Sequence, residues 1–503
     1  MVQSVDQIQD FKGKYPKQIW GLFFSEMWER FCFYGMRGML TYFMITELLM
    51  KEDIAQLQYG ATQAFVYAFT FVGGLFADKI LGFRKSLFWG GLMMIVGSAI
   101  LASNPHDNFF LGIAFTIIGT GFFKPNISTM VGKLYRPNDS RTDAGFSLFY
   151  AGINLGALLG GYLCIAIGKG ELFSQWIPEA LRWNVAFGLA AVVMIISLVN
   201  FHFVQRNLGS IGLQPGHPDS DLKDHKVKKW HEYAVYFGTL VLIPIIMTMV
   251  SKTQYTDLFM YIIGPVTLLY LFYEMSKVTP AERKKLWAAL IFIVFSILFW
   301  GIYEQSGGSL SIFAAKNLNN DLLGLDPNGV NNSGGAFYII LLAPLAGLLW
   351  IWLSKRKLEP NTIVKFGLGF LFLGLGFYAL YATKFFANLQ GVTSLNVFAI
   401  ALLIITFGEL CLSPIGLSIM TKLSTKNLQG MMMGLWFLAS AYGQYVAGII
   451  GSKMSQAKDG ASNYEALITY TDGYKQLGIY ALIAGVILIL LSPLIKKLMQ
   501  DVR

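Results

Sequence analysis

Apolar runs of about 20 residues recur along the whole chain and are separated by short polar segments. A helix of about 20 residues crosses the hydrocarbon core of a bilayer, which is about 30 Å thick. The pattern therefore predicts an all-α protein with about 14 membrane-spanning helices. They lie near residues 18–48, 59–80, 86–103, 108–132, 145–168, 183–204, 231–251, 256–276, 286–306, 336–354, 362–383, 395–421, 430–452 and 476–495. Charged residues interrupt the first run, so a hydropathy average alone would miss it.

Composition supports this interpretation, because 55% of the 503 residues are hydrophobic and only 14% are charged. A soluble protein of this length needs more charge to cover its surface. The three cysteines, Cys32, Cys164 and Cys411, fall within apolar runs and show no metal-ligand spacing. We interpret them as buried small residues and predict no metal site.

The net charge of +10 does not indicate nucleic-acid binding, because the basic residues lie in short loops between the spans. With the N-terminus inside, the inner loops hold about 27 of the 39 lysines and arginines, and the outer loops hold about 9. Positive charge is retained on the cytoplasmic side of membrane proteins. We therefore expect an integral plasma (inner) membrane protein with both termini in the cytoplasm.

The longest inner loop contains two prolines and a mixed charge run, and it divides the chain. Two spans that follow it, 231–251 and 256–276, carry few polar residues and are expected at the lipid-facing periphery. Without them the chain has six spans on each side of the loop, the layout of a two-bundle transporter. The predicted segments are a cytoplasmic N-terminus (1–17), an N-terminal six-helix bundle (18–204), a cytoplasmic linker (205–229), two extra transmembrane helices (230–278) and a C-terminal six-helix bundle (279–503).

Ionisable residues at membrane depth are costly and indicate function. They are Glu26, Glu29, Arg30, Arg37, Lys124, Glu304 and Glu409. The first four lie at offsets 0, 3, 4 and 11 of one helix, which at about 100° per residue places them on one stripe. Glu26 and Arg30 form an i, i+4 pair. An ion-pair cluster that only fixes helix packing is the alternative to a binding role.

The remaining charged residues suggest which kind of substrate the charged stripe binds. Lys124 precedes Pro125, which frees a backbone carbonyl one turn earlier, and Glu409 precedes a similar break at Ser413 and Pro414. One half of the chain thus offers three cations and two carboxylates, and the other half offers Glu304 and Glu409. A zwitterion fits such a division of charge, and the glutamates are candidate proton carriers.

Polar and aromatic side chains recur near these charges. They are Tyr34, Tyr67, Tyr150, Asn154, Trp300 and Trp436. In a chain this aromatic, any one of the rings is more readily explained by packing than by ligand binding. Asn154 is the stronger candidate, because an amide in the middle of a span needs a hydrogen-bond partner.

The segment GGLFADKILGFRK, from Gly73 to Lys85, resembles the loop motif of the major facilitator superfamily. In that motif an acidic residue, a turn and basic residues tie neighbouring helices together. Asp78, Gly82 and Arg84 occupy the matching positions. The resemblance implies that Asp78 and Arg84 have structural and gating roles.

Five further segments, in order along the chain, resemble signatures of the proton-dependent oligopeptide transporters, a family within that superfamily. They are EMWERFCFYGMRGML (26–40), GTGFFKPN (119–126), FYAGINLG (149–156), FWGIYEQ (299–305) and GELCLSPIG (408–416). The segment 430–436 also matches a family helix that brings a pocket tryptophan. The resemblance covers nearly the whole chain and implies a major facilitator fold with two extra central helices, as in bacterial members.

The resemblance also implies site roles. Arg30, Arg37 and Lys124 would face the peptide carboxylate, while Asn154 and Glu409 would receive its amino terminus. Glu26, Glu29 and Glu304 would couple protonation to Arg30 and Arg37, and Lys124 with Glu409 would form an inner gate. Tyr34, Tyr67, Tyr150, Trp300 and Trp436 would shape side-chain pockets. Phe33 and Gly335 depart from the family pattern, which usually has a tyrosine and an asparagine there.

These observations predict a proton-coupled symporter that imports di- and tripeptides by alternating access. It is expected to act as a monomer, to use no cofactor beyond the proton gradient, and not to be an enzyme, since no nucleophile–base pair or phosphate-binding loop is visible. The same fold could instead carry another small zwitterion or anion, or a drug-like substrate, or act as an exporter. A sensor without turnover is a third hypothesis.

Overall fold

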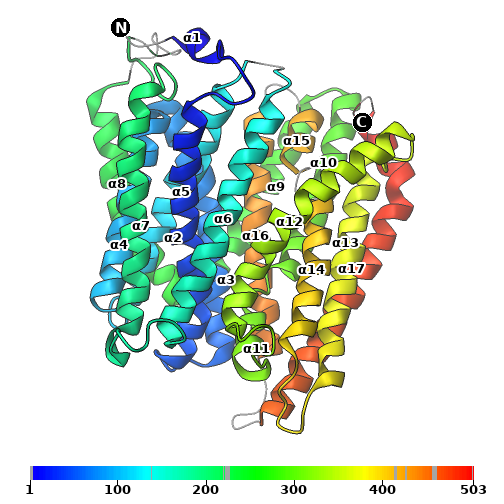
Figure 1. The fold of residues 1–503 in the computed structure, drawn as a ribbon. Helices are drawn as coiled ribbons and strands as arrows, with labels where there is room; N and C mark the ends of the chain where they lie inside the picture. Colours follow the sequence, from blue (N-terminus) through cyan, green and yellow to red (C-terminus); the bar gives the residue numbers. More distant parts are fainter. Residues whose placement is uncertain are drawn as a thin grey trace. The chain divides into compact units, whose positions relative to one another are not determined.

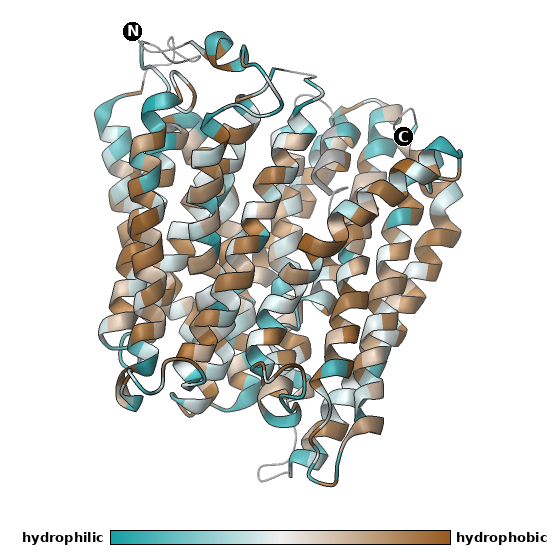
Figure 2. Cartoon of the chain, viewed as in Figure 1, coloured by the Kyte–Doolittle hydropathy of each residue, from teal (hydrophilic) through white to brown (hydrophobic). Residues whose placement is uncertain are grey.

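The computed structural model describes residues 4–136, 139–218, 220, 227–412, 416–424, 428–455, 462–500 and 502, with the backbone alone for 416–418 and 421. In these residues the regular structure is helical, apart from one isolated bridge between Leu318 and Thr393 (Figure 1). Figure 2 shows that apolar residues fill the middle of the helices, while polar residues gather at their ends. The predicted all-α class is confirmed.

The long helices correspond one to one to the predicted spans. They are α2 (Gln18–Thr46), α3 (Glu52–Phe76), α4 (Gly82–Ser103), α5 (Phe109–Lys133), α6 (Thr142–Lys169), α7 (Arg182–Val204), α8 (Lys229–Ser251), α9 (Thr253–Lys277), α10 (Pro280–Tyr303), α12 (Pro327–Lys355), α13 (Thr362–Ala382), α14 (Leu395–Leu412), α16 (Gln429–Met454) and α17 (Asn463–Met499). Twelve continuous stretches of the described residues are long and apolar enough to cross a membrane. One of them, Glu52–Ser103, contains both α3 and α4, and α2 is not among them because of its charges.

Several helices begin earlier than their apolar runs, because polar residues form the first turns. Helix α17 starts at Asn463, where the Ser462 side chain caps it and Glu465 completes a capping box. Helix α12 starts at Pro327 after the cap Asp326. Two short helices, α1 (Val5–Gln9) and α11 (Ser309–Asn317), were not predicted. The predicted span 395–421 consists of α14 and α15 (Gly416–Leu423), and the predicted break at Ser413 and Pro414 lies outside the described residues.

The chain separates into two compact units. Unit 1 contains Met1–Met39 and Phe65–Lys252, and unit 2 contains Leu40–Ala64 and Thr253–Arg503. Helices α2 and α3 therefore each pass from one unit into the other, and α8 and α9 belong to different units. The compact units thus differ from the predicted domains, which follow chain order. The predicted division into two six-helix bundles at 205–229 stays a prediction.

The segment Leu40–Ala64 joins unit 2 through specific contacts. A Cβ added to Gly60 of α3 would lie 2.7 Å from the Cα of Gly448 on α16, so the two helices cross at glycines. The Thr41 hydroxyl donates a hydrogen bond to the Gly307 carbonyl. Tyr470 donates to Glu52 at 2.8 Å. A hydropathy pattern does not predict such contacts, because they join residues that are distant in sequence.

Helices α8 and α9, together with α12, are the most exposed of the candidate spans in the described part of the chain, with 28%, 17% and 17% of their most apolar 18 residues buried. Helices α8 and α9 are each held by a few polar contacts to their own unit. In unit 1, Trp89 Nε1 donates to Thr239 Oγ1 at 3.1 Å. In unit 2, the Tyr445 hydroxyl donates to Asp257 Oδ1 at 2.6 Å. Their remaining surface is apolar, as expected of peripheral helices.

Close helix packing in unit 1 depends on glycine. A Cβ on Gly90 of α4 would lie 2.5 Å from the Gly119 carbonyl oxygen and 2.7 Å from the Phe123 amide nitrogen of α5. Both atoms belong to backbone and have little freedom to move. Small residues at such crossings allow helices in membranes to approach closely.

Gly90→Val is therefore expected to destabilise the protein, because overpacking against backbone costs about 1–3 kcal/mol. The matched control is Gly238→Val on α8, where nothing lies within 4 Å of the added Cβ. Thermal unfolding of the purified protein in detergent should show a fall of a few degrees for Gly90→Val alone. Equal melting temperatures for the two variants would contradict the close crossing of α4 and α5.

Candidate functional site

The centre of the charged stripe is Arg30, which is 1% exposed on α2. Its Nε lies 2.7 Å from Glu26 Oε1 and 2.8 Å from Glu29 Oε2. Both carboxylates are also buried, at 1% and 0% exposure. The predicted i, i+4 pair between Glu26 and Arg30 is confirmed, and Glu29 joins it as a second carboxylate on the same guanidinium.

This cluster has unused hydrogen-bonding capacity. Among the described residues, Arg30 Nη2 and Glu26 Oε2 have no hydrogen-bond partner, and Glu29 makes no hydrogen bond beyond the ion pair of its Oε2 with Arg30 Nε. Buried polar groups are normally satisfied, so each exception requires an explanation. Two carboxylates that share one arginine also carry a net charge of −1 while both are ionised. The cluster can therefore accept a proton on a carboxylate and an anionic group on the guanidinium.

The backbone around Arg30 is positioned by glycines of α6. A Cβ on Gly156 would lie 2.1 Å from the Met27 carbonyl and 2.9 Å from Arg30 Cβ, and one on Gly160 would lie 2.2 Å from the Phe31 carbonyl. Asn154, two residues before Gly156 on α6, donates its amide to the Tyr150 carbonyl at 2.9 Å. The partner that a buried amide requires is thus a local carbonyl.

Lys124 brings a second cation to the same unit. It interacts electrostatically with Glu29, and its Nζ lies 4.5 Å from the centre of the Tyr67 ring. Pro125 does not interrupt α5, which continues to Lys133. The carbonyl that Pro125 frees is that of Gly121, and it faces Gly73 of α3, where an added Cβ would lie only 2.1 Å away.

Further along α2, aromatic rings accompany both arginines. The Arg30 guanidinium lies 5.8 Å from the centre of the Phe33 ring, and that of Arg37 lies 5.7 Å from the centre of the Tyr34 ring. Phe33 is buried, at 2% exposure. The departure at Phe33 therefore places an apolar ring beside the arginine.

In unit 2, Glu409 of α14 is 8% exposed and accepts a hydrogen bond from the Tyr303 hydroxyl of α10. The Tyr303 ring packs edge-on against Trp300, with centroids 5.3 Å apart. Glu304 follows at the C-terminal cap of α10, is 4% exposed, and donates its backbone N–H to the Trp300 carbonyl. Trp436 is buried on α16.

Among the described residues, Arg84 contacts a segment between helices and does not connect two neighbouring helices directly. Its Nε donates to the Ile211 carbonyl at 2.7 Å, and Nη2 donates to the Gly209 carbonyl, so it binds the segment that begins the linker. Gly82 has φ +74, and a Cβ there would meet the backbone of Gln214 at 2.7 Å. Asp78 is exposed in the π-helical turn η1 (Ala77–Leu81). In unit 1 the motif thus anchors the linker.

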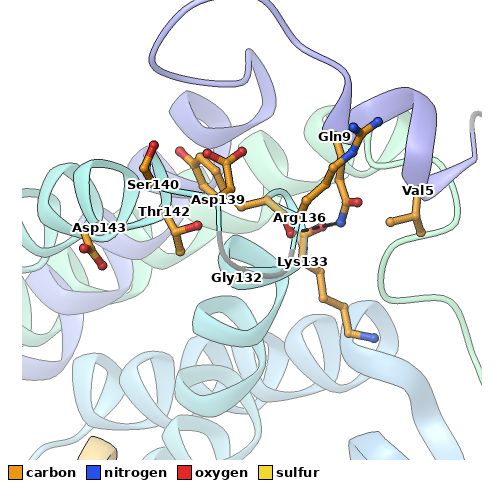
Figure 3. Close-up of a pocket in the computed structure, with 10 residues that line it drawn as sticks. Val5, Gln9, Gly132, Lys133, Arg136, Asp139, Ser140, Thr142 and Asp143 are labelled. Atoms are coloured by element: carbon orange, nitrogen blue, oxygen red, sulfur yellow. Dashed lines mark hydrogen bonds between the residues drawn. The ribbon is translucent and has the colours of Figure 1, made fainter.

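A cavity of about 770 Å³ lies at the end of unit 1 where α1 meets the connection between α5 and α6 (Figure 3). Gln9 donates to the Lys133 and Tyr135 carbonyls, both at 3.0 Å. Hydrogen bonds from Arg141 lower the pKa of the Asp139 carboxyl to about 2. None of the predicted site residues lines this cavity, so it is separate from the charged site.

Other kinds of site find no support in the described residues. They contain no grouping of three or more histidine, cysteine or acidic side chains that could hold a metal. Cys32, Cys164 and Cys411 are free and buried, as their apolar surroundings in the sequence predicted.

The sequence model of the POT family matches residues 84–467, more than half of the chain. The chain belongs to the POT family.

Relatives support this assignment over the full length. The peptide transporter YePEPT of Yersinia enterocolitica is 32% identical over an alignment of 510 positions. The alignment covers 97% of this chain and 96% of that protein. A di-/tripeptide transporter of Lactococcus lactis subsp. lactis is 31% identical and covers 97% of each chain. The crystal structure of peptide transporter POT in complex with sulfate matches with a TM-score of 0.80 at 31% identity, over 99% of this chain and all of that one. Another match, at a TM-score of 0.80 and 29% identity, is a POT family transporter in complex with 5-aminolevulinic acid, over 98% of this chain and 100% of that one.

As a POT family member, the chain is a transporter with many apolar helices and hence an integral membrane protein. The structure groups the predicted site residues within their units. Glu26, Glu29 and Arg30 lie together with Lys124 and Tyr67 in unit 1, while Glu409 lies near Trp300 in unit 2. Sequence reasoning missed Tyr303. Its position three residues after Trp300, on the same face of a helix, was the available signal.

Arg30→Met is expected to destabilise the protein strongly, because it leaves two carboxylates buried without their cation. Removal of one partner of a buried ion pair costs about 3–5 kcal/mol. The melting temperature in detergent should fall clearly below that of the wild-type chain.

The triple variant Glu26→Gln, Glu29→Gln, Arg30→Met should recover most of the loss, because it also removes the two buried carboxylates. Lys277→Met, which breaks an exposed pair with Glu274, serves as the control and should change stability by less than about 1 kcal/mol. An Arg30→Met variant as stable as the Lys277→Met control would contradict the ion-pair cluster.

Proposed function

We propose that the chain imports di- and tripeptides together with protons, as a symporter that works by alternating access. Membership of the POT family supports this proposal, and so do the relatives whose names describe peptide or di-/tripeptide transport.

The observation that carries the proposal is the division of charge at membrane depth between the units. Unit 1 contains the cations Arg30, Arg37 and Lys124 together with two carboxylates, and unit 2 contains Glu304 and Glu409. A peptide has a carboxylate at one end and an ammonium group at the other. Arg30, with Nη2 unpartnered among the described residues, fits the carboxylate, and Glu409 fits the ammonium group. Asn154 assists at the amino terminus, and Tyr34, Tyr67, Tyr150, Trp300 and Trp436 shape the side-chain pockets.

Protons are assigned to the glutamates. Glu29 is fully buried, its Oε2 is paired with Arg30 Nε at 2.8 Å, and neither of its oxygens has a further hydrogen-bond partner among the described residues. An ionised carboxylate in such surroundings is costly, and uptake of one proton neutralises the surplus charge around Arg30. Protonation of Glu26 or Glu29 thereby frees the guanidinium for the substrate carboxylate.

The remaining residues are assigned to gating. Glu304 alternates between a proton and an ion pair with Arg37, and Lys124 pairs with Glu409 as an inner gate when the site is empty. Asp78 and Arg84 control movement at the inner end of the helices. The protein lies in the plasma membrane with both termini in the cytoplasm, acts as a monomer, and needs no cofactor beyond the proton gradient. The membrane potential adds about 2.3 kcal/mol per charge for each 100 mV.

Glu29→Gln is expected to separate peptide movement from proton coupling. In proteoliposomes with an inward proton gradient, the wild-type chain should accumulate labelled dialanine above its external concentration, while the variant should not. Exchange of labelled for unlabelled dialanine needs no net proton movement and should persist in the variant. Glu274→Gln, which removes an exposed ion pair outside the site, is the control and should retain both activities.

Gradient-driven accumulation by Glu29→Gln would refute the coupling role of Glu29. No dialanine uptake by the folded wild-type chain would refute the proposed function as a whole, and substrate binding without any exchange would support a sensor.

A second candidate is transport of another small zwitterion or anion by the same site. A POT family transporter has been solved with 5-aminolevulinic acid and a peptide transporter with sulfate. The apolar Phe33 beside Arg30 also offers no hydroxyl to a peptide.

Competition with labelled dialanine distinguishes the two candidates. Unlabelled di- and tripeptides should compete at least about tenfold more strongly than 5-aminolevulinic acid, free alanine or nitrate. The proposed site matches the spacing of the ammonium and carboxylate groups of a peptide, and a lost hydrogen bond to a charged group costs about 1.5–3 kcal/mol. Stronger competition by 5-aminolevulinic acid would favour the second candidate.

A further inference from the structure

Helix α7 is hydrogen-bonded to the first part of α2 within unit 1. The Ser197 hydroxyl donates to the Ser25 carbonyl at 2.7 Å, and the Ser25 hydroxyl donates to the Ser197 carbonyl at 3.3 Å. Asn200 donates its amide to the Gly21 carbonyl at 2.7 Å and to the Ser25 hydroxyl at 2.8 Å. Ser25 and Ser197 are both fully buried, at 0% exposure. These hydrogen bonds join one turn of α2 to one turn of α7.

The bonds from α7 specify the rotation of α2 about its own axis. Two of the acceptors are backbone carbonyls of α2, which keep a fixed direction because they belong to the helix itself. On a different side, α2 packs against Gly156 and Gly160 of α6. Such a glycine surface lets two helices lie close together, but it has no side chains that fit into the grooves of the partner. The angle at which α2 presents its side chains therefore depends mainly on α7.

The side of α2 that contacts α7 lies next to Glu29. Gly21, Ser25 and Cys32 are spaced at offsets 0, 4 and 11, which places them within about 40° of one another around the helix. Glu29 lies about 60° from the centre of this side, whereas Arg30 lies about 160° from it. Glu29 thus occupies the edge of the charged stripe that is nearest to α7.

The rotation of α2 decides where the Glu29 carboxylate lies. In an α-helix the Ser25 carbonyl accepts the backbone N–H of Glu29, so the oxygen that Ser197 binds belongs to the turn that carries Glu29. Glu29 Oε2 lies 2.8 Å from Arg30 Nε, and Glu29 also interacts electrostatically with Lys124 of α5. A rotation of α2 would move Glu29 relative to Lys124, because the two residues are on different helices.

We propose that Ser197 and Asn200 are positioning residues for Glu29. They fix the rotation of α2 and thereby keep the Glu29 carboxylate in the cluster with Arg30 and Lys124. Both residues act through the backbone of α2. This inference rests on the proposed function, in which a glutamate of the cluster carries the proton, and it adds two residues of α7 to that coupling.

The functional test measures labelled dialanine in proteoliposomes. Ser197→Ala and Asn200→Ala should each lower gradient-driven accumulation about threefold, the change expected for one lost hydrogen bond between membrane helices, and the double variant should lower it about tenfold. Exchange of labelled for unlabelled dialanine needs no net proton movement and should stay within about twofold of the wild-type rate. Ser197→Thr, which retains the hydroxyl, should keep wild-type accumulation. The control is Thr116→Val on α5, because that hydroxyl is equally buried but donates to the Gly112 carbonyl of its own helix at 3.0 Å.

A native thiol on the same side of α2 reports on the rotation itself. Cys32 is fully buried, and its Sγ lies 3.7 Å from Ser98 Oγ of α4. Labelling by N-ethylmaleimide is followed at each cysteine by mass spectrometry of the purified chain in detergent. In the double variant Ser197→Ala, Asn200→Ala, labelling of Cys32 should be at least about fivefold faster than in the wild-type chain. Labelling of Cys411, which is buried in unit 2, should be unchanged.

Several results would overturn the inference and leave the proposed function intact. They are wild-type accumulation by the double variant, an equal loss of accumulation and exchange, unchanged labelling of Cys32, and faster labelling of Cys411 together with Cys32, which indicates a general loss of stability. A folded wild-type chain without dialanine uptake would overturn the proposed function and, with it, the role of α7 in coupling. The labelling of Cys32 would then still decide whether α7 fixes the rotation of α2.

Discussion

The burial of Arg30 between two carboxylates of its own helix is the constraint around which unit 1 is organised. A guanidinium at 1% exposure needs counter-charges within hydrogen-bond distance, and Glu26 and Glu29 supply them from the preceding turn. Because one cation faces two anions, the cluster is not self-contained. It interacts with Lys124 and leaves Arg30 Nη2 without a partner in the described residues, and both properties suit a site that exchanges protons and anions.

The helix crossings that stabilise the fold also position the charges. Gly156 allows α6 to approach α2 at Arg30, and Gly73 of α3 accommodates the Gly121 carbonyl that Pro125 frees beside Lys124. In unit 2, a Cβ on Gly408 of α14, next to Glu409, would lie 2.8 Å from the Gly369 carbonyl of α13. Glycines next to the charged residues therefore serve the close packing of helix backbones in both units.

The helix that carries the charged stripe is continuous with both units. Helix α2 runs from Gln18 to Thr46, with its stripe in unit 1 and its last residues in unit 2. Helix α3 returns from unit 2 to unit 1, and its glycine contact with α16 fixes the part that belongs to unit 2. A change in charge at Glu26 or Glu29 therefore occurs on a helix that is shared by both units.

The sequence by itself determined the helical class, the number of long helices and the family, because apolar length and ordered motifs are local properties. It also predicted the pairing of Glu26 with Arg30, since an i, i+4 spacing fixes that contact within one helix. Tertiary structure decided what depends on distant residues. It joined Leu40–Ala64 to unit 2, directed Arg84 to the linker carbonyls, and placed the Tyr303 hydroxyl on Glu409, 106 residues further along the chain. No local pattern specifies such contacts, because they arise only when helices far apart in sequence pack against each other.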